Sequence, residues 1–89
     1  MFCVYVLLCA NGSLYVGQTQ NLTARLHEHL SGRVQSTKRR LPLTVILTEH
    51  YVTRAEAMHR ERYLKSGYGR KWLGRRAPRG RPAPDSPAR

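Results

Sequence analysis

The sequence is short of acidic residues, of cysteine and of long apolar stretches. Its 89 residues hold five Asp and Glu against sixteen Lys and Arg, which gives a formal net charge of +11. A domain this basic usually binds a polyanion, either nucleic acid or an anionic membrane surface, although charge can also serve solubility alone. The length excludes a multidomain enzyme with a separate cofactor domain, and it allows only a modest core.

No segment approaches the roughly 20 apolar residues that a membrane-spanning helix needs. The apolar opening, residues 1–10, lacks a basic leader and runs into Asn11-Gly12, so we interpret it as a strand rather than a signal peptide. Cys3 and Cys9 are about 20 Å apart along such a strand, which excludes a disulfide between them. Free thiols without a zinc-ligand spacing indicate a reducing, cytoplasmic location.

Charge is absent from the first 24 residues, so the N-terminal third is expected to form the core. The apolar run at 2–9 predicts a central strand buried on both faces. The Asn11-Gly12 turn then predicts a hairpin into a second strand at 13–18, and a third strand is predicted at 43–52. We interpret residues 33–42 between the helix and this strand as a basic loop.

Capping signals predict two helices. Asn21 precedes leucines at positions 22, 26 and 30, and Ser31-Gly32 ends this helix. The second helix opens with the capping box Thr53-x-x-Glu56 and runs to about residue 66. Glu56 is also expected to pair with Arg60 at i+4. A short basic helix is predicted to follow.

The element order β-β-α-β-α-α predicts an α+β fold, in which helices flank a small three-stranded antiparallel sheet. Residues 1–74 are expected to form one domain. Residues 75–89 are rich in Pro and Arg and have no large apolar residue that could form a core, which predicts a disordered basic tail.

Glu61 is the acidic residue in the most unusual position. It lies at i+4 within the apolar stripe formed by Ala57, Met58 and Leu64. A carboxylate on a packing face is costly unless it has a partner. The pattern alone leaves open a metal ligand, a general base, or an internal ion pair with one of the basic residues.

Arg25 and His29 share one side of the first helix at i, i+4, beside the leucine stripe. At the edge of a core their polar groups would open into a cleft, where an arginine suits a phosphate and a histidine could position a water or a leaving group. The alternative for each is a solvated helix edge. His27 and Glu28 point away from the stripe and are assigned no role.

Tyr5 and Tyr15 bring hydroxyl groups into strands that carry no charge. They are either core aromatics or members of a site. A strict two-residue turn at Asn11-Gly12 would put them on opposite faces of the sheet. If both serve one site, the hairpin must therefore contain a loop of odd length or a bulge.

Together these residues resemble the GIY-YIG nuclease family. The two half-motifs are Val4-Tyr5-Val6 and Tyr15-Val16-Gly17, and Arg25, His29 and Glu61 follow in the order of the family. The stretches SGRVQSTKRRLPL and RERYLKSGYGRKWL resemble its small, single-domain bacterial members. The glycine of the first half-motif is Val4 here, which removes no functional side chain.

The resemblance implies metal-dependent hydrolysis of phosphodiester bonds in DNA. Glu61 would hold one divalent cation, Mg²⁺ or Mn²⁺. Arg25 would bind the scissile phosphate, and Tyr5 would orient or deprotonate the attacking water. A tyrosine acting as base needs nearby positive charge, because its ordinary pKa is about 10. Tyr15 and His29 would support this network through hydrogen bonds, and the roles of the two tyrosines could be exchanged.

Gly17 would permit close backbone packing beside the site. Further residues are expected to contact the nucleic-acid backbone without reading its sequence. They are Arg33, Ser36, Thr37, Lys38, Arg39, Arg40, Lys65, Arg70 and Lys71.

We therefore expect weak or structure-directed specificity, in DNA repair or recombination. RNA stays open as a substrate, no membrane partner is expected, and no protein partner is identified. One alternative is a non-catalytic or partner-dependent nucleic-acid-binding module. A basic ribosomal or RNA-associated protein is a third, but it would not need the carboxylate of Glu61 on a core face.

Overall fold

The computed structural model describes residues 1–76, which form a three-stranded antiparallel sheet and three helices. The α+β fold predicted from the sequence is confirmed. The elements are β1 (Phe2–Cys9), β2 (Leu14–Thr19), α1 (Leu22–Leu30), β3 (Leu43–Tyr51), α2 (Arg54–Lys65) and α3 (Gly67–Arg76). Residues 75–76 of the expected tail belong to α3, and its remainder lies outside the described residues. Within residues 1–76, no helix is long and apolar enough to cross a membrane.

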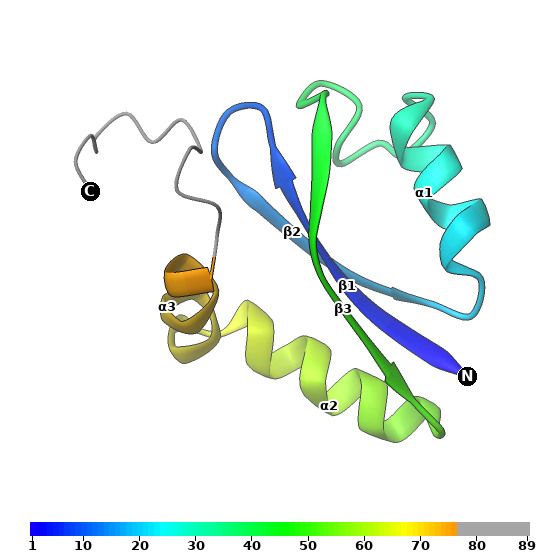
Figure 1. Ribbon diagram of the computed structural model, residues 1–89, viewed down its shortest axis with the longest axis vertical. Coiled ribbons are helices and arrows are strands. Elements are labelled where there is room, and N and C mark those ends of the chain that lie inside the picture. The colour runs from blue at the N-terminus through cyan, green and yellow to red at the C-terminus, as the bar shows by residue number, and fades with distance from the viewer. Residues whose placement is uncertain (77–89) are drawn as a thin grey trace.

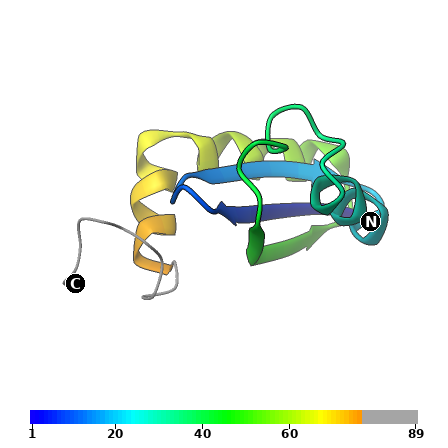
Figure 2. The same cartoon turned by 90° about the horizontal axis from the view of Figure 1, so that it is seen from above.

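β1 is the central strand, as its apolar sequence predicts. The strand order is β2-β1-β3, and every residue of β1 after Phe2 is buried. The strands run diagonally between α1 and the α2–α3 pair (Figure 1). Seen from above, they stack edge over edge, with α1 near the N-terminus of β1 (Figure 2). Each face of β1 therefore lies beneath a helix, one face toward α2 and the other toward α1.

The β1–β2 hairpin departs from a two-residue turn. Cys9 N–H donates to Ser13 O at 2.8 Å, and the loop between them spans residues 10–12. Gly12 N–H donates to Cys9 O at 2.9 Å, and Gly12 has φ 88°, a conformation that favours glycine. The odd loop length pairs Leu7 with Tyr15, so both motif tyrosines lie on the same face.

The apolar core lies on the α2 side of the sheet. Val4, Val6 and Val16 pack there against residues of α2 and α3, chiefly Leu64 and Leu73. Burial of such side chains stabilises a fold by about 25 cal/mol per Å² of apolar surface. The predicted capping box of α2 is present, with Thr53 and Glu56 bonded reciprocally at 3.2 Å. This core fixes α2 along the sheet.

The other face is covered by α1 and by residues 33–42. The prediction that Leu30 belongs to the buried row of α1 is wrong. Leu30 is 58% exposed, and His29 is the buried residue of this helix. The row at i, i+4 that faces the sheet is Arg25 and His29. Residues 33–42 fold into turns anchored by buried Val34, and Ala10 N–H donates to Arg40 O at 2.9 Å, which ties these turns to the hairpin. This face is therefore more polar than the α2 face.

Candidate active site

Three buried side chains form a hydrogen-bonded chain on the α1 face. Tyr5 Oη lies 2.9 Å from His29 Nε2, and His29 Nδ1 lies 2.8 Å from Thr37 Oγ1. Tyr5 is 1% exposed, and His29 and Thr37 are fully buried. The chain thus connects the central strand, α1 and the 33–42 segment through buried polar groups.

Tyr15 and Gly17 of β2 pack around the Tyr5 end of this chain. The Tyr15 ring centroid lies 5.0 Å from that of His29 and 6.2 Å from that of Tyr5. Gly17 is the cross-strand partner of Tyr5, and a Cβ atom there would lie 2.6 Å from Tyr5 Oη. Glycine is therefore required at position 17 because the tyrosine hydroxyl passes directly over it, in keeping with the expected close packing.

Arg25 lies at the open edge of the same cluster. Its Nη1 donates to Glu28 Oε1 at 2.9 Å, and the two side chains are 36% and 47% exposed. Its guanidinium also interacts with the Tyr5 hydroxyl. Glu28, which was assigned no role from the sequence, is therefore the partner that orients Arg25. A guanidinium with five N–H donors keeps others for an anion.

Both titratable groups of the buried chain are uncharged at neutral pH. Burial raises the pKa of Tyr5 to about 12, although Arg25 acts in the opposite direction. Burial, and then the charge of Arg25, lower the pKa of His29 below its ordinary value. The positive charge expected to make Tyr5 a stronger acid is present, but burial outweighs it.

Glu61 lies on the other side of the sheet. Its Oε1 accepts a hydrogen bond from Gln18 Nε2 at 3.0 Å, and its Oε2 lies 2.8 Å from Lys65 Nζ. The side chain is 20% exposed. The internal ion pair considered from the sequence is therefore formed, with Lys65 as its partner. Tyr5, Tyr15, Arg25 and His29 are brought together, whereas Glu61 contacts edge strand β2.

A pocket lies between Tyr15 and Lys65. It has a volume of about 250 Å³ and is lined by Leu14, Tyr15, Val16, Leu64, Lys65, Arg70 and Leu73. Tyr15 therefore borders both the tyrosine–histidine cluster and the space beside Lys65, the partner of Glu61. Apolar walls with two cationic side chains suit a segment of a polyanion.

The chemistry of Glu61 fits a single, hard divalent cation. Lys65 Nζ already lies at Oε2, so the carboxylate accommodates positive charge there. Among residues 1–76, no group of three or more His, Cys, Asp or Glu side chains could hold a metal ion. A cation at Glu61 would therefore take its other ligands from water and phosphate oxygens, which is how Mg²⁺ is commonly bound.

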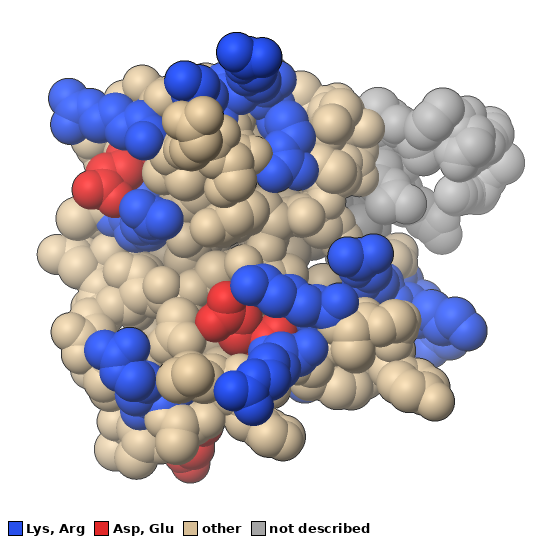
Figure 3. Space-filling model, turned by 180° about the vertical axis from the view of Figure 1, so that it is seen from behind, with Lys and Arg blue, Asp and Glu red and all other residues tan. Residues whose placement is uncertain are grey.

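Most residues expected to contact nucleic acid are exposed. Those with exposed positions are Arg33, Ser36, Lys38, Arg39, Lys65, Arg70 and Lys71. Figure 3 shows basic side chains on the upper and lower parts of one face, with an uncharged band between them. Arg40 is half-buried and donates to Ser13 Oγ at 2.8 Å. The expectation for Thr37 is wrong, because its side chain is buried against His29.

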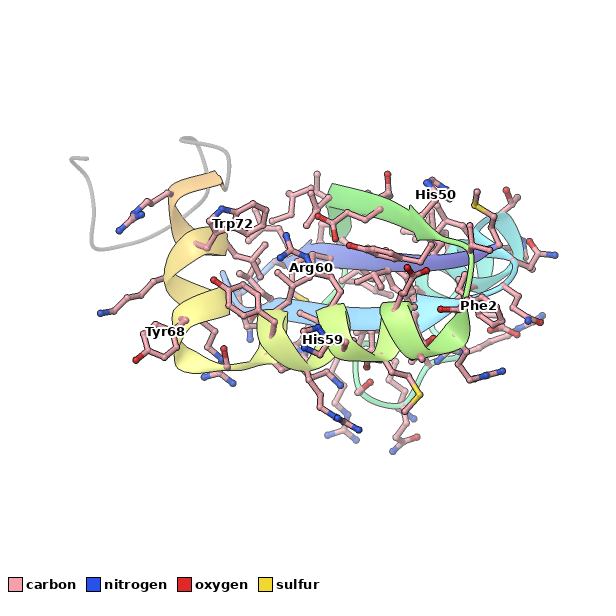
Figure 4. The ribbon with its side chains drawn as sticks, turned by 90° about the horizontal axis from the view of Figure 1, so that it is seen from below. Phe2, His50, His59, Arg60, Tyr68 and Trp72 are labelled. Carbon is pink, nitrogen blue, oxygen red and sulfur yellow. The ribbon has the colours of Figure 1, made fainter. Side chains whose placement is uncertain are left out.

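A second polar cluster lies on the α2 face. Arg60 donates to both carboxylate oxygens of Glu49, at 2.8 and 3.0 Å, and Tyr51 donates to Glu49 Oε1 at 2.8 Å. Figure 4 shows Arg60 reaching from α2 toward Trp72, whose ring centroid is 4.8 Å from Arg60 Cζ. The expected pairing of Glu56 with Arg60 is wrong, because the guanidinium is bound to Glu49 across the core.

Comparison with known proteins identifies the family of this domain. The GIY-YIG catalytic domain, the domain of a nuclease family, matches residues 1–73. A UPF0213 protein of Bacillus licheniformis is 44% identical over 62 residues, which cover 68% of this chain and 64% of that protein, so the chain matches just under two thirds of this relative. A UPF0213 protein of Staphylococcus aureus is 38% identical over 64 residues, covering 71% of this chain and 78% of that protein.

A solved structure extends the likeness to the fold. The solution NMR structure of a UPF0213 protein from Bacillus halodurans superimposes with a TM-score of 0.54 at 32% identity, and it covers 84% of each chain. The chain belongs to the GIY-YIG family, among its small UPF0213 members.

Proposed function

We propose that this protein is a metal-dependent endonuclease that hydrolyses phosphodiester bonds in DNA. The observation that carries the proposal is the buried Tyr5–His29 hydrogen bond beside the open guanidinium of Arg25. A neutral tyrosine held by a neutral histidine can move a proton, and an adjacent arginine can bind the anion on which the reaction occurs.

Arg25 is the proposed ligand of the scissile phosphate. It is partly exposed, and its pairing with Glu28 fixes the guanidinium without using all its donors. The guanidinium would also stabilise the charge that builds on the phosphate oxygens during attack. Tyr15 packs beside Tyr5 and His29 and would hold the water or the substrate by hydrogen bonding.

Tyr5 is proposed to transfer a proton rather than to act as a free tyrosinate, because its pKa is raised to about 12. The attacking water gives a proton to Tyr5 Oη while the tyrosine gives its own proton to His29 Nε2. The hydroxide formed attacks phosphorus, the leaving oxygen takes a proton from solvent, and His29 returns its proton through Tyr5 Oη to water. His29 suits this role because its lowered pKa keeps it unprotonated beforehand.

Glu61 is the proposed metal ligand, and Mg²⁺ or Mn²⁺ bound there would supply stabilisation of negative charge on the phosphate. Lys65 would then leave the carboxylate and become available to the substrate, together with Arg70 in the same pocket.

The exposed basic residues support a nucleic-acid substrate bound through its backbone. Contacts to the backbone, without base readout, would come from Arg33, Ser36, Lys38, Arg39, Lys71 and the half-buried Arg40. We therefore propose weak or structure-directed specificity, a cytoplasmic location, and a setting in repair or recombination. The alternative is a binding module that does not cleave alone.

A cleavage assay with Glu61→Gln tests the proposal. End-labelled single-stranded, duplex and branched DNA, and an RNA strand, would be incubated with Mg²⁺, Mn²⁺ or EDTA. We expect metal-dependent cutting of DNA that falls by at least about 100-fold in Glu61→Gln. Glu56→Gln, a change on the same helix, should cut normally. Tight binding without cleavage by the wild-type protein would instead support the binding module.

A further inference from the structure

We propose that Thr37 is a positioning residue that holds His29 in the tautomer with its proton on Nδ1, so that Nε2 faces Tyr5 as an acceptor. This inference rests on the proposed function, since it concerns the proton acceptor of that site. Thr37 does not touch substrate in this proposal and acts only through His29.

The hydrogen-bond partners of the histidine carry the argument. A neutral imidazole has one nitrogen that donates and one that accepts, and each nitrogen of His29 has one protein partner. Arg25 can only donate, and its positive charge acts on the Tyr5 hydroxyl, which favours an orientation with the oxygen lone pairs toward Arg25 and the proton toward His29 Nε2. With Nε2 as the acceptor, Nδ1 carries the ring proton and donates it to Thr37 Oγ1.

The surroundings make Thr37 hard to replace as that acceptor. Thr37 and His29 are both fully buried, so water cannot take over the bond to Nδ1. A branched side chain such as threonine also has few rotamers. Without the hydroxyl, the ring would either leave Nδ1–H unpaired or turn to the other tautomer, whose Nε2–H could not accept from Tyr5.

The backbone around Thr37 holds it in place. Thr37 N–H donates to Val34 O at 3.1 Å, Lys38 N–H donates to Val34 O at 2.9 Å, and Arg40 N–H donates to Thr37 O at 2.9 Å. Val34 is itself buried. The exposed Lys38 and Arg39 thus stand on the same turn as the hydroxyl that orients His29. This turn would therefore both contact the substrate and orient the histidine that accepts the proton.

Nitrogen NMR of the full-length protein tests the assignment without any need for cleavage. Long-range ¹H–¹⁵N spectra distinguish the two histidine tautomers. We expect wild-type His29 to carry its proton on Nδ1, Thr37→Ser to keep that state, and Thr37→Val to lose it. Thr37→Val should also lower the rate of bound-substrate cleavage about tenfold or more while the Kd for DNA changes less than about twofold. Val34→Ala serves as the control that weakens packing in the same turn but keeps the tautomer.

Two results would overturn the proposal. One is a wild-type His29 with its proton on Nε2, which can be read even if Thr37→Val fails to fold. The other is a folded Thr37→Val protein with an unchanged tautomer and an unchanged cleavage rate. A wild-type protein that shows the Nδ1 proton but cuts no substrate would contradict the proposed function and leave the role of Thr37 as the orienting partner supported.

Discussion

The two faces of the sheet each hold a polar cluster, and the clusters are built from different chemistry. On the α2 face, Arg60 and Glu49 form a bidentate ion pair that Tyr51 completes. On the α1 face, Tyr5, His29 and Thr37 form a chain that is neutral at pH 7. The first cluster joins β3 to α2, with the guanidinium also over Trp72 of α3.

The difference separates a structural role from a chemical one. In the α2 cluster, charge is matched by opposite charge, so the cluster is complete as folded. In the α1 cluster, the chain ends at a tyrosine oxygen beside the partly exposed Arg25, where an anion can approach. Substitutions should therefore affect stability on one face and reactivity on the other.

Gly17→Ala should have the largest effect on reactivity. The added Cβ would lie 2.6 Å from Tyr5 Oη and displace the hydroxyl from His29 and Arg25. We expect cleavage to fall by about 100-fold or more, since proton transfer depends on that geometry. Gly74→Ala, where a Cβ meets open space, is the control and should cut normally. Equal activity of the two variants would mean that Tyr5 is not positioned by this contact.

Arg60→Met should have the largest effect on stability. It leaves Glu49 without its bidentate partner and removes the guanidinium over Trp72. We expect the free energy of unfolding to fall by about 1–3 kcal/mol, measured by urea denaturation. The folded fraction should retain its cleavage rate. Arg62→Met, at an exposed site on the same helix, is the control and should change the free energy of unfolding little. A loss of catalysis in folded Arg60→Met would contradict the assignment of stability to one face and reactivity to the other.

Acidification should destabilise the α1 face selectively. The pKa of His29 is lowered by burial and by Arg25, with Glu28 opposing. Tyr5, Tyr15 and Thr37 are its other neighbours. As pH falls through the ordinary histidine value of about 6.5, the unfolded chain binds the proton first, so stability declines toward the lower folded pKa. Denaturation curves against pH should show this decline, and His29→Gln should show less of it. Cleavage should fall at lower pH, near the lowered folded pKa of His29, because a protonated His29 cannot accept from Tyr5.

The smallest effect is expected at the basic turn. Lys38→Ala with Arg39→Ala should weaken DNA binding and reduce the slope of log K against log salt by about 1.8, because two phosphate contacts are lost. Melting should be nearly unchanged, since both side chains are exposed. The matched double change Arg54→Ala with Arg62→Ala removes the same charge elsewhere and should leave the slope closer to that of the wild type. An equal reduction of the slope in both double variants would indicate a general effect of net charge rather than contacts from this turn.

The local elements were predictable from the sequence because their signals are local. The cap at Asn21, the capping box at Thr53 and the apolar β1 all formed as the pattern indicates. The shape of the hairpin was predictable only on one condition. If Tyr5 and Tyr15 share a site, the loop must have an odd number of residues, and the structure has such a loop. The four clustered site residues followed from the family motif and its order.

The partners of those residues were not predictable, because they are distant in sequence. Gln18 meets Glu61 across 43 positions, and Thr37 meets His29 from a segment without regular periodicity. Charge and hydroxyl content made Thr37 resemble a surface residue, since composition does not reveal which side of a turn is buried. Glu28 was overlooked because helix periodicity placed it away from the leucines, one of which, Leu30, is itself exposed.

The tyrosine–histidine–threonine chain also has a consequence for how the molecule matures. Tyr5 and His29 are 24 positions apart, and Thr37 comes from a third segment, so the three groups meet only after strand, helix and turn have all docked. Contacts of such sequence separation form late relative to single helices. A partly folded chain, or one whose 33–42 segment has locally opened, would still carry its positive charge and bind polyanions. It would lack the assembled chain of Tyr5, His29 and Thr37 and so could not transfer the proton. We therefore expect DNA binding to appear earlier in folding than cleavage, and to persist when the 33–42 segment opens.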